Sequence, residues 1–266
     1  MQKNSQEKDM QFLEKRFIEL SRTAYQREIV TYTDFLNLNE QNILHSLPKN
    51  RLFSRYQCFG GYDMAERQMA AFIPDALYLR CGKECLTPEE IRYPFRGMRI
   101  MPLHRKYAED LTHRDYLGAA LNLGIERAKT GDIISWDDDA VIFIHRDMAG
   151  LLLEELTRIR HTQVTVREVS PEDINYTPRY EEIRGTAASV RLDSLLALAF
   201  ASSRTKLSGL IEGARVYVNG RLVTSNGYQP KEGDIISVRG MGKFRFAEEG
   251  GRTRKNRLCI VLHKYI

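Results

Sequence analysis

The chain has 266 residues, of which 42% are hydrophobic, and it carries a net charge of +5. Its length suggests two or three domains, and its apolar fraction suits packed cores and excludes a disordered chain. No apolar run approaches the roughly 20 residues of a membrane-spanning helix. The polar first residues also lack the apolar centre of a signal peptide, so a cytoplasmic protein is expected.

The cysteines and histidines do not form a metal-binding pattern. Cys81 and Cys85 are separated by three residues, and neither Cys58, Cys259 nor any of the six scattered histidines completes a zinc set. We therefore expect reduced, partly buried thiols and neither a metal nor a cofactor.

Positive charge is concentrated in the last third of the chain. Residues 186–266 contain 14 Lys and Arg against 6 Asp and Glu, a net charge of +8, whereas the remainder has a net charge of −3. This asymmetry favours a polyanionic partner for residues 186–266, although a solvated basic face would have the same composition.

Residues 1–75 are expected to be mainly helical. Apolar residues recur at helical spacing from Phe12 to Leu20, Thr33 opens a second such stretch, and Pro48 ends it.

A turn is predicted next, at Gly60-Gly61, and Asp63 with Glu66 fits a capping box for a short helix that ends before Pro74. A Gly-Gly turn before a helix can bind an anion, but a plain connector is favoured because no fuller phosphate-loop pattern is present.

Residues 76–170 alternate between strand and helix patterns. From residue 98 the order is β-α-β-β-α-β, the split pattern of ferredoxin-like and RNA-recognition-type domains. The predicted strands are 76–80, 93–101, 132–135, 140–145 and 164–169, and the predicted helices are 111–123 and 149–159.

This element order does not by itself establish RNA binding. RNA-recognition domains stack bases on aromatic side chains of the third strand. That strand here has a single aromatic residue, Phe143, and lacks the basic-Gly-aromatic signature. A spacer or a protein-contact surface is therefore an alternative role for this sheet, and the basic loop His104-Arg105-Lys106 is a weaker RNA candidate.

Residues 171–185 contain two prolines, many charges and little periodicity, which predicts a linker. The segment after it predicts two short helices on a small sheet. An apolar stripe runs from Leu192 to Ala199, and Ser202 or Ser203 can cap a second helix. Asn219-Gly220 predicts a type I′ hairpin turn, because both residues tolerate positive φ.

These pieces resemble the S4 RNA-binding domain in order and spacing. The matching pieces are Arg191-Leu192-Asp193, Ser203-Arg204, Ile211-x-Gly213, Val216-x-Val218-Asn219-Gly220 and Gly233-Asp234-x-Ile236-x-Val238. The chain departs from many members at Ser208 and Gly209, where basic residues are common, and at Lys206, where an acid is common.

The resemblance implies an L-shaped basic surface that holds the backbone of folded RNA, with Asp193 as a structural partner for an arginine. It implicates Arg191, Ser203, Arg204, Arg215, Asn219 and Arg221. Five further cations of the same segment complete our candidate set: Lys206, Lys231, Arg239, Lys243 and Arg245.

Further motifs lie outside the S4 segment: Thr33-Asp34-Phe35-Leu36, Gly60-Gly61-Tyr62 with Ala65-Glu66-Arg67, the stretch from Arg114 to Ala119, and Lys129-x-Gly131-Asp132. With these motifs and the S4 segment, the whole chain is similar to the bacterial YlmH-like family. The similarity implies a ribosome-associated protein that contacts large-subunit RNA and tRNA and that acts on stalled translation complexes.

The expected fold is α+β. It has a helical part (1–75), a ferredoxin-like domain (76–170), the linker (171–185) and a small S4 domain with a C-terminal strand extension (186–266). We expect a non-catalytic protein with structured RNA as its partner, without a membrane or a small-molecule substrate.

Two other classes stay open. An RNA-modifying enzyme would need more sequence: a pseudouridine synthase carries a large catalytic domain, and a methyltransferase needs a Gly-rich nucleotide loop that the chain lacks. A protein-interaction adaptor linked to cell division is the other alternative, since residues 1–185 are nearly neutral.

Overall fold

The structure, a computed structural model, describes residues 2–62, 64–82, 86–136, 138–170 and 179–265, with side chains from residue 10 onward except that of Trp136. It divides into two compact units, Met1–Tyr176 and Thr177–Ile266. Among the described helices, none combines the length and the apolar character that crossing a membrane requires.

The first part of unit 1 contains a small sheet as well as helices, so the prediction of a helical region over 1–75 is wrong in part. Its three strands pair antiparallel in the order β1-β3-β2. The elements are α1 (Gln2–Arg27), β1 (Thr31–Tyr32), α2 (Leu38–Ser46), the 3-10 turn η1 (Lys49–Arg51), β2 (Arg55–Phe59), β3 (Met69–Ile73), α3 (Asp75–Cys81) and α4 (Pro88–Ile91).

Strand β3 replaces the short helix that the capping pattern predicted before Pro74. Its five residues are all buried, because Ala70 and Phe72 pack with α1 and α2 while the alternate residues face another core. Periodicity cannot distinguish such a short, wholly apolar run from a buried helix. Asp63, the residue proposed to begin the helix, lies outside the described residues.

The predicted strand at 76–80 is also wrong, because this segment forms helix α3. Pro74 precedes the helix, and Gly82 ends it in the left-handed conformation at φ 63°. Proline before a first turn and glycine after a last turn are typical helix boundaries, and they outweigh the local strand pattern.

The second part of unit 1 has the predicted β-α-β-β-α-β order, with one short strand, β7, added before the last. Its antiparallel sheet runs β5-β6-β4-β8-β7. The elements are β4 (Phe95–Pro102), η2 (Arg105–Tyr107), α5 (His113–Asn122), η3 (Arg127–Lys129), β5 (Thr130–Trp136), β6 (Asp139–His145), α6 (Arg146–Glu155), β7 (Arg158–Ile159) and β8 (Thr162–Val169). Ile159, expected on the second helix, lies in β7 instead.

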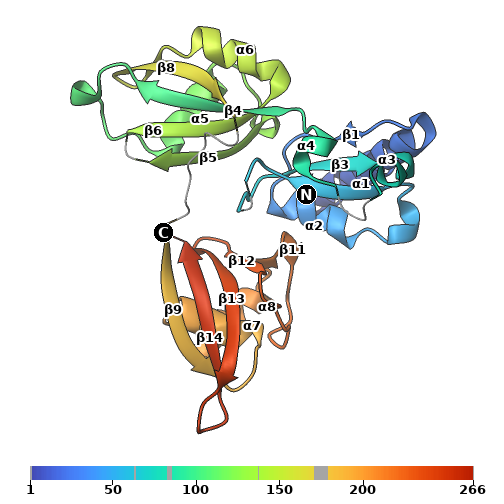
Figure 1. The fold of residues 1–266 in the computed structure, drawn as a ribbon, viewed down its shortest axis with the longest axis vertical. Helices are drawn as coiled ribbons and strands as arrows, with labels where there is room; N and C mark the ends of the chain where they lie inside the picture. The colour runs from blue at the N-terminus through green and yellow to red at the C-terminus, as the bar shows by residue number, and fades with distance from the viewer. Residues whose placement is uncertain (1, 63, 83–85, 137, 171–178, 266) are drawn as a thin grey trace. The chain divides into compact units, whose positions relative to one another are not determined.

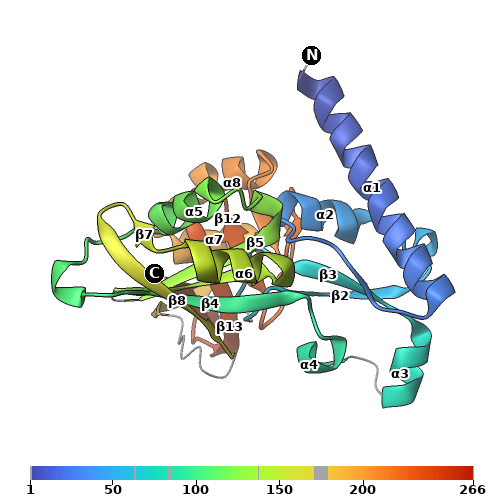
Figure 2. The ribbon, with the colours of Figure 1, turned by 90° about the horizontal axis from the view of Figure 1, so that it is seen from above.

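Both faces of this sheet are covered. Met98, Ile142 and Leu152 belong to the core beneath α5 and α6. On the opposite face, Val141 and Phe143 share a core with residues of β3, so the strand β6 is buried over six consecutive positions. Figure 2 shows α5 and α6 lying along the sheet.

A polar joint holds the two parts of unit 1 together. Asp132 of β5 accepts hydrogen bonds from Tyr62 Oη (2.9 Å), Glu66 N (2.7 Å) and Arg67 N (3.1 Å). The Arg67 guanidinium donates in return to the carbonyls of Thr130 (2.8 Å), Phe35 (2.9 Å) and Arg127 (3.0 Å). Burial lowers the pKa of Arg67, and the nearby carboxylates of Glu40 and Asp132 oppose this effect.

Unit 2 has two helices packed on one side of a six-stranded antiparallel sheet, in the order β11-β10-β12-β13-β14-β9 (Figure 1). The elements are β9 (Tyr180–Ala187), α7 (Leu192–Ala199), α8 (Arg204–Glu212), β10 (Val216–Val218), β11 (Arg221–Leu222), β12 (Ile235–Val238), β13 (Gly242–Arg252) and β14 (Leu258–Tyr265).

Strand β9 occupies part of the predicted linker at 171–185. It pairs with β14 over eight positions, from Tyr180 opposite Tyr265 to Ala187 opposite Leu258. Residues 171–178 of the predicted linker lie outside the described residues. The alternation in β9 is weak because charged residues fill it, so the pairing could not be recognised from its own pattern.

Gly61 should tolerate no side chain. It has φ +101°, and a Cβ atom there would lie 2.2 Å from a ring carbon of Phe143. We expect Gly61→Ala to lower the free energy of unfolding by about 2–4 kcal/mol, through backbone strain and overpacking. Urea unfolding followed by circular dichroism measures this loss.

Gly118→Ala is the matched control for Gly61→Ala. Gly118 lies inside α5, and a Cβ there meets nothing within 4 Å. The control should therefore raise stability by about 0.5–1 kcal/mol. Equal effects of the two substitutions would contradict the packing of Gly61 against Phe143.

Candidate nucleic-acid interface

The helical half of the candidate interface forms as its sequence predicts. The stripe Leu192, Leu195, Leu196 and Ala199 is buried against the sheet of unit 2. Ser203 is the N-cap of α8, where its side chain accepts a hydrogen bond from Lys206 N (3.4 Å). Ser203 therefore acts first as a helix cap.

Two arginines of the candidate set, Arg191 and Arg204, each contact a side chain in the first turn of α7. The Arg191 guanidinium donates Nε to Asp193 Oδ1 (3.1 Å) and Nη2 to Asp193 Oδ2 (3.3 Å). Arg204 donates Nη2 to Ser194 Oγ (2.6 Å). The Asp193 side chain is only 10% exposed, so it orients Arg191, as expected, and leaves the outer edge of that guanidinium toward solvent.

Asn219 is held by the protein itself. Asn219 and Gly220 adopt φ 48° and 76°, which confirms the hairpin turn. The Asn219 amide donates to Asp234 Oδ1 (2.8 Å) and its carbonyl accepts from Ile235 N (2.9 Å). This residue therefore shapes the hairpin, and it is less suited to an RNA contact than its neighbour Arg221.

A second group of cations lies on the sheet. Lys243 stands opposite Ser237, and Arg245 opposite Ile235. Because alternate residues of these strands fill the core, both cations point to the face of the sheet away from α7 and α8. The Arg239 guanidinium carbon lies 6.0 Å from the ring centre of Tyr217, and the backbone N–H of Arg239 donates to Arg215 O (2.9 Å).

The remaining cations decorate the turns. Arg221 is exposed on β11, and Lys231 is exposed before β12, where its backbone N–H donates to Asp234 Oδ2 (2.8 Å). Within the described part of the chain, no carboxylate oxygen lies within 4.0 Å of the charged groups of Arg204, Lys206, Arg215, Arg221, Lys231 or Arg239. Cations without an acidic neighbour are available to phosphate groups.

The five-stranded sheet of unit 1 offers no surface for base stacking around Phe143, the aromatic residue of β6. Phe143 is 1% exposed, and Tyr62 stacks over it with ring centres 5.8 Å apart. The loop His104–Lys106, the weaker candidate, is exposed.

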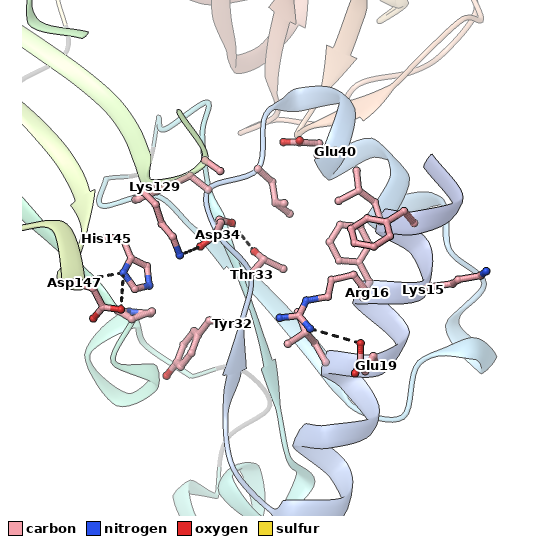
Figure 3. A pocket seen from close by; sticks show the side chains of 18 of the residues that line it. Lys15, Arg16, Glu19, Tyr32, Thr33, Asp34, Glu40, Lys129, His145 and Asp147 are labelled. Carbon is pink, nitrogen blue, oxygen red and sulfur yellow. Dashed lines mark hydrogen bonds and ion pairs between the residues drawn. The ribbon is translucent and has the colours of Figure 1, made fainter. Parts of the chain in front are cut away.

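A hollow of about 780 Å³ in unit 1 had no signal in the sequence, because its walls come from separate segments: α1, residues 32–36 and residues 145–147 at the start of α6 (Figure 3). Its charges largely neutralise each other: Lys129 pairs with Asp34 (2.6 Å), and Arg146 pairs with Asp147 (3.9 Å). Burial and the Lys129 charge lower the pKa of His145, so this imidazole is neutral at pH 7. This pairing does not favour a polyanion.

Similarity to known proteins identifies the family of this chain. The model described as "Putative RNA-binding domain in YlmH" matches residues 90–173, and the model of the S4 domain matches residues 190–236. "Ribosome-associated protein quality control protein P2" of Bacillus subtilis (strain 168) is 30% identical over 255 residues, which cover 93% of this chain and 92% of the relative. The chain belongs to the YlmH-like family. 

Among solved structures, "Cell division protein ylmH from Streptococcus pneumoniae" is similar to this YlmH-like chain with a TM-score of 0.47 and 22% identity. The match covers 62% of this chain and 94% of that one.

Most of the pieces that carried the YlmH-like resemblance outside the S4 domain converge on the joint of unit 1, whereas the stretch from Arg114 to Ala119 lies in α5 and packs in the core beneath it. Asp34 and Phe35 contact the 127–131 segment, and Arg67 and Asp132 join across it. Their spacing of up to about a hundred residues left no local signal of this meeting. These motifs are thus explained by packing rather than by RNA contact.

Asp193 should act on stability more than on RNA affinity. We expect Asp193→Ala to lower the free energy of unfolding of unit 2 by about 1–2 kcal/mol, since the nearly buried carboxylate is lost while Arg191 stays partly solvated. Thermal unfolding of the full chain measures this effect.

Glu248→Ala removes an exposed carboxylate of the same unit and should leave stability unchanged within about 0.5 kcal/mol. A loss of RNA affinity without any change in stability would contradict the structural role of Asp193.

Proposed function

We propose that this YlmH-like protein is a non-catalytic RNA-binding protein that holds structured RNA through its C-terminal unit. The observation that carries the proposal is the set of exposed cations around α7, α8 and the hairpin that have no carboxylate partner among the residues the structure describes. Such an arrangement neutralises phosphates and positions a folded RNA, because backbone contacts carry no sequence information.

Ribosomal RNA and tRNA are the proposed partners. The Bacillus subtilis relative is named for ribosome association and protein quality control, and it aligns over almost the whole chain. We extend the proposal to the large ribosomal subunit, to stalled complexes that retain a tRNA, and with these to a cytoplasmic location. Both matched models describe binding modules, which favours binding over catalysis.

Salt dependence tests the phosphate contacts. If five to seven cations contact phosphates, the slope of log affinity against log salt concentration should be about −4 to −6. Arg221→Gln with Lys231→Gln should make this slope less steep by about 2 units, since each cation contributes about 1. Fluorescence anisotropy with tRNA at several salt concentrations measures both slopes.

Lys15→Gln with Arg27→Gln is the control, because it removes the same charge from exposed positions of α1. The control should leave the slope unchanged. A flat salt response of the unmodified chain, or equal changes in the two double variants, would refute binding through the C-terminal cations.

A further inference from the structure

The second part of unit 1, from β4 to β8, cannot bind RNA as RNA-recognition domains do. Those domains stack bases on aromatic side chains of the open sheet face. Here that face is occupied, because Val141 and Phe143 lie in the core shared with β3. Any contact between RNA and this part of the chain must therefore use another surface.

A different surface is built at one end of the sheet, where the loop after β4 lies against the hairpin of β7 and β8 (Figure 2). Leu103 N donates to Gln163 O (2.9 Å), and Glu109 N donates to Thr162 Oγ1 (3.0 Å). His161 N donates to Glu109 Oε2 (3.2 Å). These bonds fix the two segments side by side.

A hollow of about 290 Å³ lies between the two segments. Its lining contains aromatic, cationic and amide groups: His104, Tyr107, Arg158, His161, Thr162 and Gln163. Tyr107 is 77% exposed, and Lys106 Nζ lies 5.8 Å from its ring centre. An exposed ring beside cations is suited to stacking on a nucleobase, since every base presents a π-face.

The cations of this surface divide into two kinds. Arg105 pairs with Asp139 (3.3 Å), and Arg160 pairs with Asp115 (2.9 Å). For Lys106 and Arg158, by contrast, no carboxylate of the described residues lies within 4.0 Å. These two charges, one beside Tyr107 and one in the lining of the hollow, are available to phosphates.

The hairpin tip is held in a fixed and strained form. Arg160 adopts φ 52°, a left-handed conformation that is uncommon for a residue with a long side chain. Arg158 Nε donates to Arg160 O (2.8 Å), and its Nη2 lies 3.4 Å from His161 Nδ1. Strained backbone of this kind persists only where its surroundings hold it, and it is frequent at binding sites.

We propose that this end of unit 1 binds an unpaired stretch of RNA, with one base stacked on Tyr107 and adjacent phosphates held by Lys106 and Arg158. The inference rests on the proposed RNA-binding function and adds a second contact, which would engage single-stranded nucleotides next to the folded RNA that the C-terminal unit holds. Stacking and phosphate contacts predict little dependence on base sequence.

The test uses the full chain and two probes, a twelve-nucleotide oligouridylate and a blunt RNA hairpin. Tyr107→Leu with Arg158→Gln should weaken oligouridylate binding at least about fivefold and leave hairpin binding within twofold. Tyr107→Phe keeps the ring and should bind as the unmodified chain does. Tyr25→Leu with Arg27→Gln, an exposed pair on α1, is the matched control and should change neither affinity.

The outcomes separate this inference from the proposed function. Loss of hairpin binding in Arg221→Glu with Lys231→Glu, without any effect of the Tyr107 and Arg158 variant on oligouridylate, would overturn the inference and keep the function. The reverse pattern would keep the inference and overturn the function. Displacement of oligouridylate by a polyglutamate peptide at equal concentration would identify an acidic protein as the occupant and overturn the inference.

Discussion

The contact between Arg67 and β5 is the constraint on which unit 1 depends. Asp132 accepts hydrogen bonds from three donors of the 62–67 segment, and Arg67 donates to three backbone carbonyls. Arg127 lies beside this centre, and burial together with the Arg67 charge lowers its pKa to about 10. Because buried polar groups must be paired, removing one of these side chains would leave several of its partners buried without a hydrogen bond.

This joint determines where the protein can meet RNA. By fixing the small sheet over β6, it converts the face that RNA-recognition domains use into a hydrophobic core. In our proposals, the binding role then falls to the cations of the C-terminal unit and to the edge around Tyr107. A domain with the element order of an RNA-binding fold thus presents its chemistry at the rim, which agrees with the rule that fold alone does not specify function.

The sequence was most informative where local chemistry decides the structure. The stripe from Leu192 to Ala199, the cap at Ser203 and the turn at Asn219-Gly220 each depend on neighbours a few residues away, and each formed as predicted. Strand β3 and helix α3 were mistaken because short apolar runs fit both states. The carboxylate partner of Asn219, the burial of Phe143 and the hollow beside Tyr107 depend on contacts across the fold, which no local pattern encodes.

The pairing of β9 with β14 has a consequence for synthesis. Ala187 can pair with Leu258 only after the intervening chain has been synthesised. That intervening chain contains α7, α8 and the hairpin. Contacts so distant in sequence form slowly, because loop closure must precede them. During translation the unit would therefore emerge with its helices ready and its sheet open. Its cations would then be exposed on a nascent chain that is still attached to the ribosome, whose RNA they are proposed to bind.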